Sequence, residues 1–78
     1  MNKKNDLAAC VTQALDRYFA DLDGETPADI YDMVIRQVER PLLESIMGRC
    51  SGNQTAAAVM LGITRNTLRR KLLDHGLL

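Results

Sequence analysis

Apolar side chains recur at three- and four-residue steps through most of this chain, which is the spacing of one face of an α-helix. The first series predicts a helix from about residue 6 to residue 22, with Asn5 as its N-cap and Gly24 as its terminator. Its apolar positions are Leu7, Val11, Leu15, Tyr18 and Leu22. The sequence shows no strand-like alternation. We therefore predict an all-α fold with four helices per subunit.

The second apolar series is longer and begins at clearer signals. Thr26 is a suitable N-cap, Pro27 fits the first helical position, and Asp29 favours the positive end of a helix. The stripe continues to about Cys50. Its members at four-residue steps are Ile30, Val34, Val38, Leu42 and Ile46. Pro41 predicts a kink, because proline removes a backbone donor and clashes with the preceding turn.

A chain of 78 residues has a core that seldom stabilises a fold alone. The stripe of the second helix is longer than one small domain needs, so we expect part of it to face a second copy of the chain. The alternative is that the first helix covers the whole stripe. Residues 1–50 are thus expected to be dimerisation helices. Cys10 and Cys50 do not have the spacing of a metal or redox site, and both are expected to be small buried residues.

Residues 51–78 are predicted to form two short helices joined by a turn. Asn53 can cap a third helix over Gln54–Leu61, and Gly62 suits a left-handed turn. Thr64 can cap a fourth helix that runs from Arg65 to about His75. Ala58 is small where the two helices would cross. The apolar residues expected behind the fourth helix are Ile63, Leu68 and Leu72. This arrangement is typical of a helix-turn-helix unit.

Charge is divided unevenly although its sum is zero. Residues 52–78 contain four basic and one acidic side chain, whereas residues 1–51 contain six basic and nine acidic ones. A basic tip on an acidic body concentrates the positive field at the predicted helix-turn-helix, where DNA would dock.

The residue types of this segment suit DNA binding. Thr64 and Arg65 open the fourth helix, where recognition helices make most of their base contacts. Phosphate contacts are expected from Thr67, Arg69, Arg70 and Lys71. The start of the third helix can hold another phosphate through Asn53, Gln54 and Thr55. The structural alternative is that Asn53 only caps its helix and that Arg69 and Arg70 form an ordinary solvated surface.

No enzyme chemistry is indicated by the sequence. His75 is the only histidine, and it is expected to interact with the helix dipole at a C-terminus. The sequence lacks a nucleophile–base set, a phosphate-binding glycine loop and a metal-ligand cluster, so no cofactor is expected. Neither a signal peptide nor a membrane-spanning run is present, and we expect a cytoplasmic protein with reduced thiols.

Three stretches resemble the Fis family of bacterial nucleoid-associated proteins. They are QALDRYFADLDG (residues 13–24), DIYDMVIRQVERPLLESIM (residues 29–47) and GNQTAAAVMLGITRNTLRRKLLDHG (residues 52–76). The resemblance implies a homodimer with an intertwined four-helix core, two helix-turn-helix units at opposite ends, and bent DNA read with loose sequence specificity. It implies DNA contacts at Asn53, Gln54, Thr55, Arg65, Thr67, Arg69, Arg70 and Lys71.

The chain also departs from the enteric members of that family. Thr64 replaces an asparagine, and Ala56, Leu73 and Asp74 replace basic residues. Few residues precede the first helix, so we expect no hairpin arm and no stimulation of DNA invertases. We expect weaker flanking contacts, with a slope of log affinity against log salt of about −9 for a dimer.

Two other functions stay open at this stage. The helix-turn-helix pattern also resembles the DNA-binding domain of NtrC-type activators, of which this chain could be an isolated copy. A helical dimer could instead act only as a protein adaptor. RNA polymerase is a further candidate partner that the sequence neither requires nor excludes.

Overall fold

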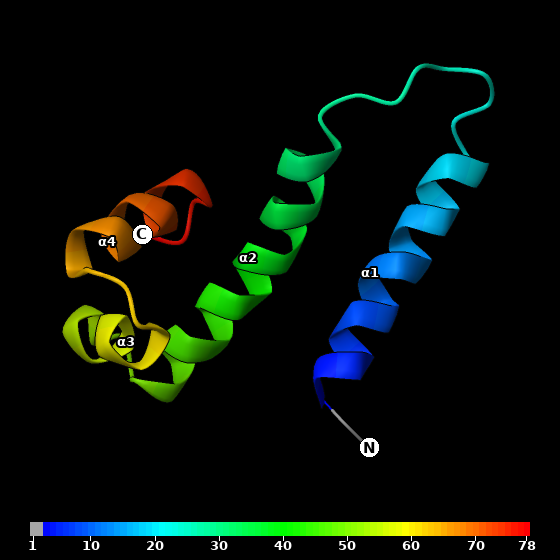
Figure 1. Cartoon of the computed structure of the whole chain (residues 1–78). Helices are drawn as coiled ribbons and strands as arrows, with labels where there is room; N and C mark the ends of the chain where they lie inside the picture. Colours follow the sequence, from blue (N-terminus) through cyan, green and yellow to red (C-terminus); the bar gives the residue numbers. More distant parts are fainter. Residues whose placement is uncertain (1–2) are drawn as a thin grey trace. The chain divides into compact units, whose positions relative to one another are not determined.

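Residues 3–78 form four α-helices and no strand (Figure 1). The computed structural model describes the backbone of residues 3–78 and the side chains of residues 6–78. The helices are α1 (Lys3–Ala20), α2 (Ile30–Arg49), α3 (Gln54–Leu61) and α4 (Arg65–Asp74). The predicted all-α class is confirmed. No helix in this range is both long and apolar enough to cross a membrane.

The chain divides into two compact units within α2. The first unit extends to Val34 and the second runs Ile35–Leu78. In the first unit, the predicted apolar face of α1 is half-buried at Val11, Leu15 and Tyr18. The rings of Tyr18 and Phe19 meet edge to face, with centroids 5.4 Å apart. This is a favourable geometry for aromatic side chains.

The start of α1 differs from the prediction. The helix begins at Lys3, so the backbone of Asn5 is already helical and does not occupy an N-cap position. The side chain of Asn5 lies outside the described residues. Cys10 is exposed and Cys50 is half-buried, so the prediction of a buried thiol is wrong for Cys10. Cys10 is one residue, or about 100° around the helix, away from Val11 and therefore lies off the half-buried face.

The start of α2 also differs from the prediction. The helix begins at Ile30 and not at Pro27. Asp29 has a φ of 55°, in the left-handed region, so a right-handed helix cannot run from Pro27 into Ile30. The Asp29 carbonyl instead accepts a hydrogen bond from the Met33 N–H at 3.0 Å. The helix then continues through Pro41 to Arg49. The kink at Pro41 stays a prediction.

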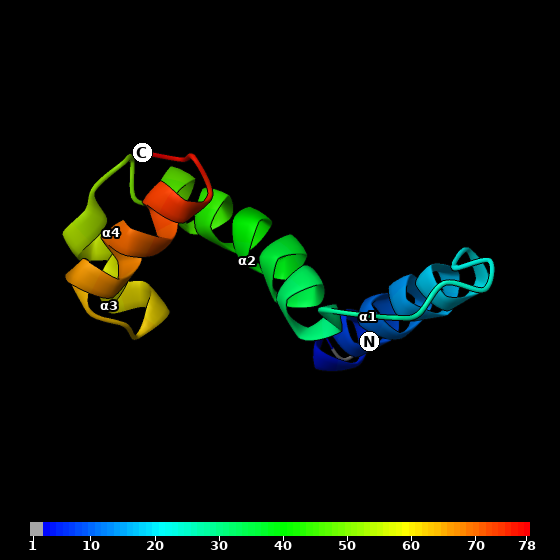
Figure 2. The ribbon, with the colours of Figure 1, turned by 90° about the horizontal axis from the view of Figure 1, so that it is seen from above.

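The core of the second unit is built by three helices. Its buried residues are Leu43 from α2, Ala57 and Ala58 from α3, and Leu68 and Leu72 from α4. Burying a leucine side chain contributes about 1.5–3 kcal/mol, so the three leucines dominate this small core. Both views show α3 and α4 beside the C-terminal half of α2 (Figures 1 and 2). This half of α2 is thus part of the support on which α3 and α4 rest.

The turn between α3 and α4 has the predicted form. Gly62 has a φ of 79°, and its N–H donates to the carbonyls of Ala58 at 2.9 Å and Val59 at 3.2 Å. The Ile63 N–H donates to the same Ala58 carbonyl at 3.1 Å. These bonds satisfy carbonyls at the end of α3 that would otherwise lack partners. The small side chain of Ala58 is 4% exposed, as expected where two helices approach closely.

Candidate nucleic-acid interface

The first turn of α4 is fixed by the side chain of Thr64. This residue has the extended backbone of an N-cap, with φ −73° and ψ 155°. Its Oγ1 accepts a hydrogen bond from the Thr67 N–H at 3.1 Å. The predicted cap is therefore confirmed. Because the hydroxyl oxygen is used here, Thr64 sets the entry of the chain into α4 and the position from which Arg65 projects.

A second hydrogen bond orients the hydroxyl of Thr67. The Oγ1 atoms of Thr64 and Thr67 lie 2.9 Å apart, and the geometry has Thr64 donating to Thr67. The Thr67 hydroxyl then keeps its own hydrogen for an outside acceptor. A phosphate oxygen is such an acceptor, and Thr67 lies within the first turn of α4 at its positive dipole end.

Three arginines give α4 an exposed basic surface. The side chains of Arg65, Arg69 and Arg70 are exposed, while Leu68 and Leu72 are buried. Arg70 lies opposite the two leucines at 3.6 residues per turn, Arg69 lies at the side of the helix, and Arg65 is its first residue. Within residues 6–78, no carboxylate lies within 4.0 Å of these three guanidinium groups. Each group therefore keeps the paired donors that match a phosphate or the edge of a guanine.

The polar side chains at the start of α3 differ in how free they are to bind a phosphate. Asn53 has extended backbone, and its Oδ1 accepts from the Ala56 N–H at 3.1 Å, which confirms the predicted cap. Thr55 is exposed. The side-chain oxygen of Gln54 is buried without a hydrogen-bond partner among the described residues. Buried polar atoms are usually paired. Because a phosphate oxygen accepts hydrogen bonds, the amide nitrogen of Gln54, which donates them, is the part of this side chain suited to a phosphate.

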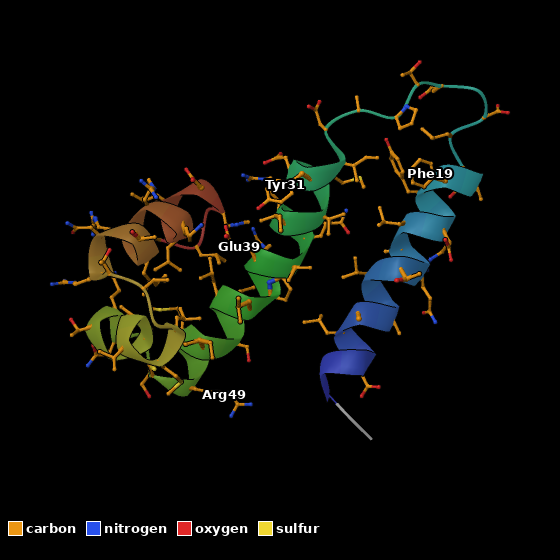
Figure 3. All side chains as sticks on the ribbon, in the orientation of Figure 1. Phe19, Tyr31, Glu39 and Arg49 are labelled. Atoms are coloured by element: carbon orange, nitrogen blue, oxygen red, sulfur yellow. The ribbon has the colours of Figure 1, made fainter. Side chains whose placement is uncertain are left out.

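Lys71 differs from the arginines of α4. Its Nζ lies 2.9 Å from Oε2 of Glu39 on α2, and its side chain is only 33% exposed. Glu39 lies on the side of α2 that faces α4 (Figure 3). The positive charge of Lys71 is thus matched by a carboxylate of the same unit, whereas the charges of Arg65, Arg69 and Arg70 are not.

The last turn of α4 is bonded to α2 at three further points. His75 is buried, and its Nε2 lies 2.8 Å from Oε1 of Glu39. Arg36 donates to the Asp74 carbonyl at 3.2 Å, and Arg40 donates to the His75 carbonyl at 2.5 Å. Carbonyls at a helix C-terminus lack helical partners and carry partial negative charge, which guanidinium donors satisfy. We call this set the α2–α4 clamp; its members are Arg36, Glu39, Arg40, Lys71, Asp74 and His75.

The electrostatics of the clamp favour an ionised Glu39. The hydrogen bond from Lys71, and then that from His75, hold the pKa of Glu39 below its ordinary value, against the opposing effect of burial. A charge-assisted hydrogen bond is about twice as strong as one between neutral groups. The carboxylate uses both oxygens, one for each partner. It therefore fixes two positions of α4 at once.

The sequence places His75 at a helix C-terminus but does not indicate its partner. Arg36, Glu39 and Arg40 are spaced three and four residues apart, so they share one face of α2. That face continues to Leu43 in the core. The spacing is visible in the sequence, but nothing local indicates that this face meets the end of α4.

Comparison with known proteins agrees with this geometry. A family model described as "Bacterial regulatory protein, Fis family" matches residues 34–75. This range contains the clamp, α3 and α4. The chain belongs to the Fis family.

Several Fis-family relatives match beyond that range. A Fis-like DNA-binding protein of Neisseria meningitidis serogroup A is 56% identical over 73 residues, which cover 94% of this chain and 92% of the relative. A Fis-like DNA-binding protein of Ralstonia nicotianae is 55% identical over 75 residues, or 96% and 97% of the two chains. The DNA-binding protein Fis of Actinobacillus succinogenes is 51% identical over 71 residues, or 91% and 72%.

The Fis family is one of regulatory DNA-binding proteins with a helix-turn-helix, so the ligand of this fold is double-stranded DNA. In this chain the helix-turn-helix consists of α3, the turn at Gly62, and α4. Seven of the nine candidate contact residues lie in α3 or α4, and the other two, Asn53 and Thr64, are the N-caps of these helices. Among the described residues, eight of the nine have no acidic side chain as a hydrogen-bond or ion-pair partner, whereas the ninth, Lys71, is paired with Glu39.

Proposed function

We propose that two copies of this chain bind double-stranded DNA together, with α4 of each copy in a major groove. The observation that carries the proposal is the set of exposed arginines on α4 that have no carboxylate within 4.0 Å in the described part of the chain. A helix with an apolar back and an unneutralised basic front suits the groove in shape and charge.

The contacts divide between bases and backbone. Arg65, at the first position of α4, is proposed to read base edges, because the N-terminal residues of a recognition helix reach them. Thr64 positions it through the cap. Backbone phosphates are proposed for Thr67, Arg69 and Arg70, and for the start of α3 through Asn53, Gln54 and Thr55. Lys71 adds to the positive field of this surface.

Dimerisation is proposed to involve residues 1–50. In the single chain, Leu42 of the apolar series of α2 is 47% exposed, and Ile35, another apolar residue of this helix, is 38% exposed. A chain this short also has a small hydrophobic core, so large apolar side chains left in water cost a sizeable part of its stability. Light scattering of the purified protein should give the mass of a dimer. Leu42→Lys should lower that mass, whereas Val59→Lys, an equal charge change at an exposed α3 site, should not.

We further propose that the protein bends DNA, acts in transcription regulation and is located in the cytoplasm, at the nucleoid. Loose specificity fits a surface in which most groups suit phosphates, since phosphate contacts carry no sequence information. Ala56 and Leu73 add no charge at the flanks. Arg69 and Arg70 are the two cations of each copy assigned to phosphates, so a dimer is expected to have a salt slope of about −4, shallower than the value of about −9 expected from the sequence. Circular permutation of a bound site in a gel shift measures the bend.

The decisive test is duplex DNA binding by Arg65→Ala. Removing a bidentate bond to a base should weaken binding about 5- to 150-fold, which corresponds to the usual 1–3 kcal/mol. The matched control is Arg17→Ala, which removes an exposed arginine from α1 and should change affinity little. Equal affinity of Arg65→Ala and the unsubstituted protein would refute the assignment of α4 as the recognition helix.

No catalytic activity, cofactor or small-molecule substrate forms part of the proposal. A monomer that binds DNA with the same arginines would instead favour the role of an NtrC-type DNA-binding domain. A dimer that does not bind duplex DNA would favour a protein adaptor. Contact with RNA polymerase is a separate proposal, and transcription from a bound promoter with and without the protein would reveal it.

A further inference from the structure

The α2–α4 clamp joins the last turn of the DNA-reading helix to a helix that has no proposed DNA contact of its own. Four side-chain bonds cross between the two helices, and Glu39 takes part in two of them. Its carboxylate is 20% exposed, and the His75 ring is 3% exposed. Ion pairs of this kind hold geometry better than exposed ones, because water competes less for the charges.

Glu39 is the acceptor on which Lys71 and His75 converge. Lys71 lies in the last turn of α4 and His75 is the C-cap of this helix, four residues later; each bonds to a different oxygen of the carboxylate. If Lys71 moved to a phosphate, one oxygen of a mostly buried carboxylate would be left without its partner. Removing one member of such a pair is costly, because the other charge stays desolvated. The exposed arginines bear no such cost when they move to DNA.

From this geometry we propose that Glu39 is a positioning residue for DNA binding, and that Lys71 acts on Glu39 and not on a DNA phosphate. The inference rests on α4 being the recognition helix. The clamp holds the C-terminal half of α4 at a fixed angle to α2, so that Arg65, Arg69 and Arg70 meet the groove together. An acidic residue thereby strengthens the binding of a polyanion.

The first arm of the test removes the internal pair without changing net charge. In Glu39→Gln/Lys71→Gln one positive and one negative group disappear, and the amides can still hydrogen-bond to each other. The measurement is log affinity for a duplex against log salt. We expect the slope of the double variant to equal that of the unsubstituted protein. Arg70→Gln, the control, should make the slope shallower by about 0.9 for each phosphate that is no longer neutralised.

The second arm depends on the sign of one change. If Glu39 were only an acid near DNA, Glu39→Gln would raise affinity by removing repulsion. A positioning role predicts the opposite, a fall of about tenfold, equivalent to 1.4 kcal/mol. Glu44→Gln is the matched control: it removes an exposed acid whose one ion pair within residues 6–78 is with Arg40 at 3.7 Å, and the affinity of this variant should rise or stay constant. Circular dichroism at the assay temperature checks that each variant is folded.

If Glu39→Gln and the double variant do not fold, Lys71→Met carries the test. It keeps the apolar stem of the side chain and removes the ammonium group alone. An unchanged salt slope supports the proposal, and a decrease equal to that of Arg70→Gln overturns it.

The outcomes separate this inference from the proposed function. If neither Arg70→Gln nor Arg65→Ala changes DNA binding, α4 is not the recognition helix, and the inference fails with the proposed function. If Arg70→Gln and the double variant make the salt slope shallower by the same amount, only the inference fails, because Lys71 would then contact a phosphate. Higher affinity of Glu39→Gln would also overturn it.

Discussion

The His75 ring lies 2.8 Å from the carboxylate of Glu39, a residue 36 positions earlier in the chain. This bond links the two ends of the second unit, since it joins the C-terminal end of α4 to the middle of α2. It also makes the stability of the unit depend on the charge of one glutamate.

The contribution of Glu39 to stability should therefore depend on pH. The pKa of Glu39 is lower in the folded chain than its ordinary value, first because of Lys71 and then because of His75. The ionised form therefore stabilises the fold above the unfolded pKa, about 4.3, and this contribution is lost as pH falls through the folded pKa. Urea unfolding at a series of pH values should show Glu39→Gln less stable at neutral pH, with the difference shrinking in acid. A difference that does not change with pH would contradict the assigned role of the carboxylate.

The core leucines predict a contrast within α4. Leu68→Ala should destabilise the fold by about 2–5 kcal/mol, because it leaves a cavity in a core where Leu68 is 0% exposed. Leu73→Ala removes the same atoms from a site that is 52% exposed and should stay within about 0.5 kcal/mol. Thermal unfolding followed by circular dichroism measures both variants. Similar destabilisation at the two sites would mean that Leu73 is also covered, for example in a dimer.

Two glycines should respond in opposite directions to alanine. A Cβ at Gly62 or at Gly48 would meet no atom within 4 Å, so packing does not distinguish them. Gly62 has a φ of +79°, and Gly62→Ala should cost about 1–2 kcal/mol for the left-handed backbone. Gly48 lies inside α2, and Gly48→Ala should stabilise by about 0.5–1 kcal/mol. Denaturant midpoints provide the comparison, and a stabilised Gly62→Ala would rule out the left-handed turn at this position.

Asn53 allows capping to be separated from DNA binding. Asn53→Ala should destabilise α3 by about 1 kcal/mol, because the Ala56 N–H is left without its acceptor. Asn53→Asp keeps that acceptor and should keep stability, but its negative charge should weaken DNA binding if a phosphate lies at this helix end. Unfolding and duplex binding are measured on the same preparations. Undiminished binding by Asn53→Asp would show that Asn53 serves only as a cap.

The helix-turn-helix can be predicted from the sequence because its signals are local. Asn53 and Thr64 cap helices whose first turns lie beside them in the chain, and Gly62 supplies its own turn. Each side chain needs only neighbours within four residues to do this. The predicted boundaries of α3 and the predicted start of α4 are therefore confirmed.

The remaining features depend on distant or subtle effects. Thr26 and Pro27 have the composition of a helix start, but the left-handed backbone of Asp29 moves the start to Ile30. The clamp joins residues 32 to 38 positions apart, and no local pattern specifies which faces will meet. The sequence also predicts a phosphate contact for Lys71, as for Arg69 and Arg70, because it shows the positive charge of Lys71 but not the carboxylate that pairs with it.

The separation of α4 into free and paired cations bears on how long a complex would last. The cations of α4 that have no carboxylate within 4.0 Å among the described residues lie within residues 65–70, fewer than two turns of helix. A contact area this short gives each copy few bonds to break, and residence times follow mainly from dissociation. On the proposed function, DNA sites would exchange the protein rapidly, and their occupancy would follow how much of it the cell contains.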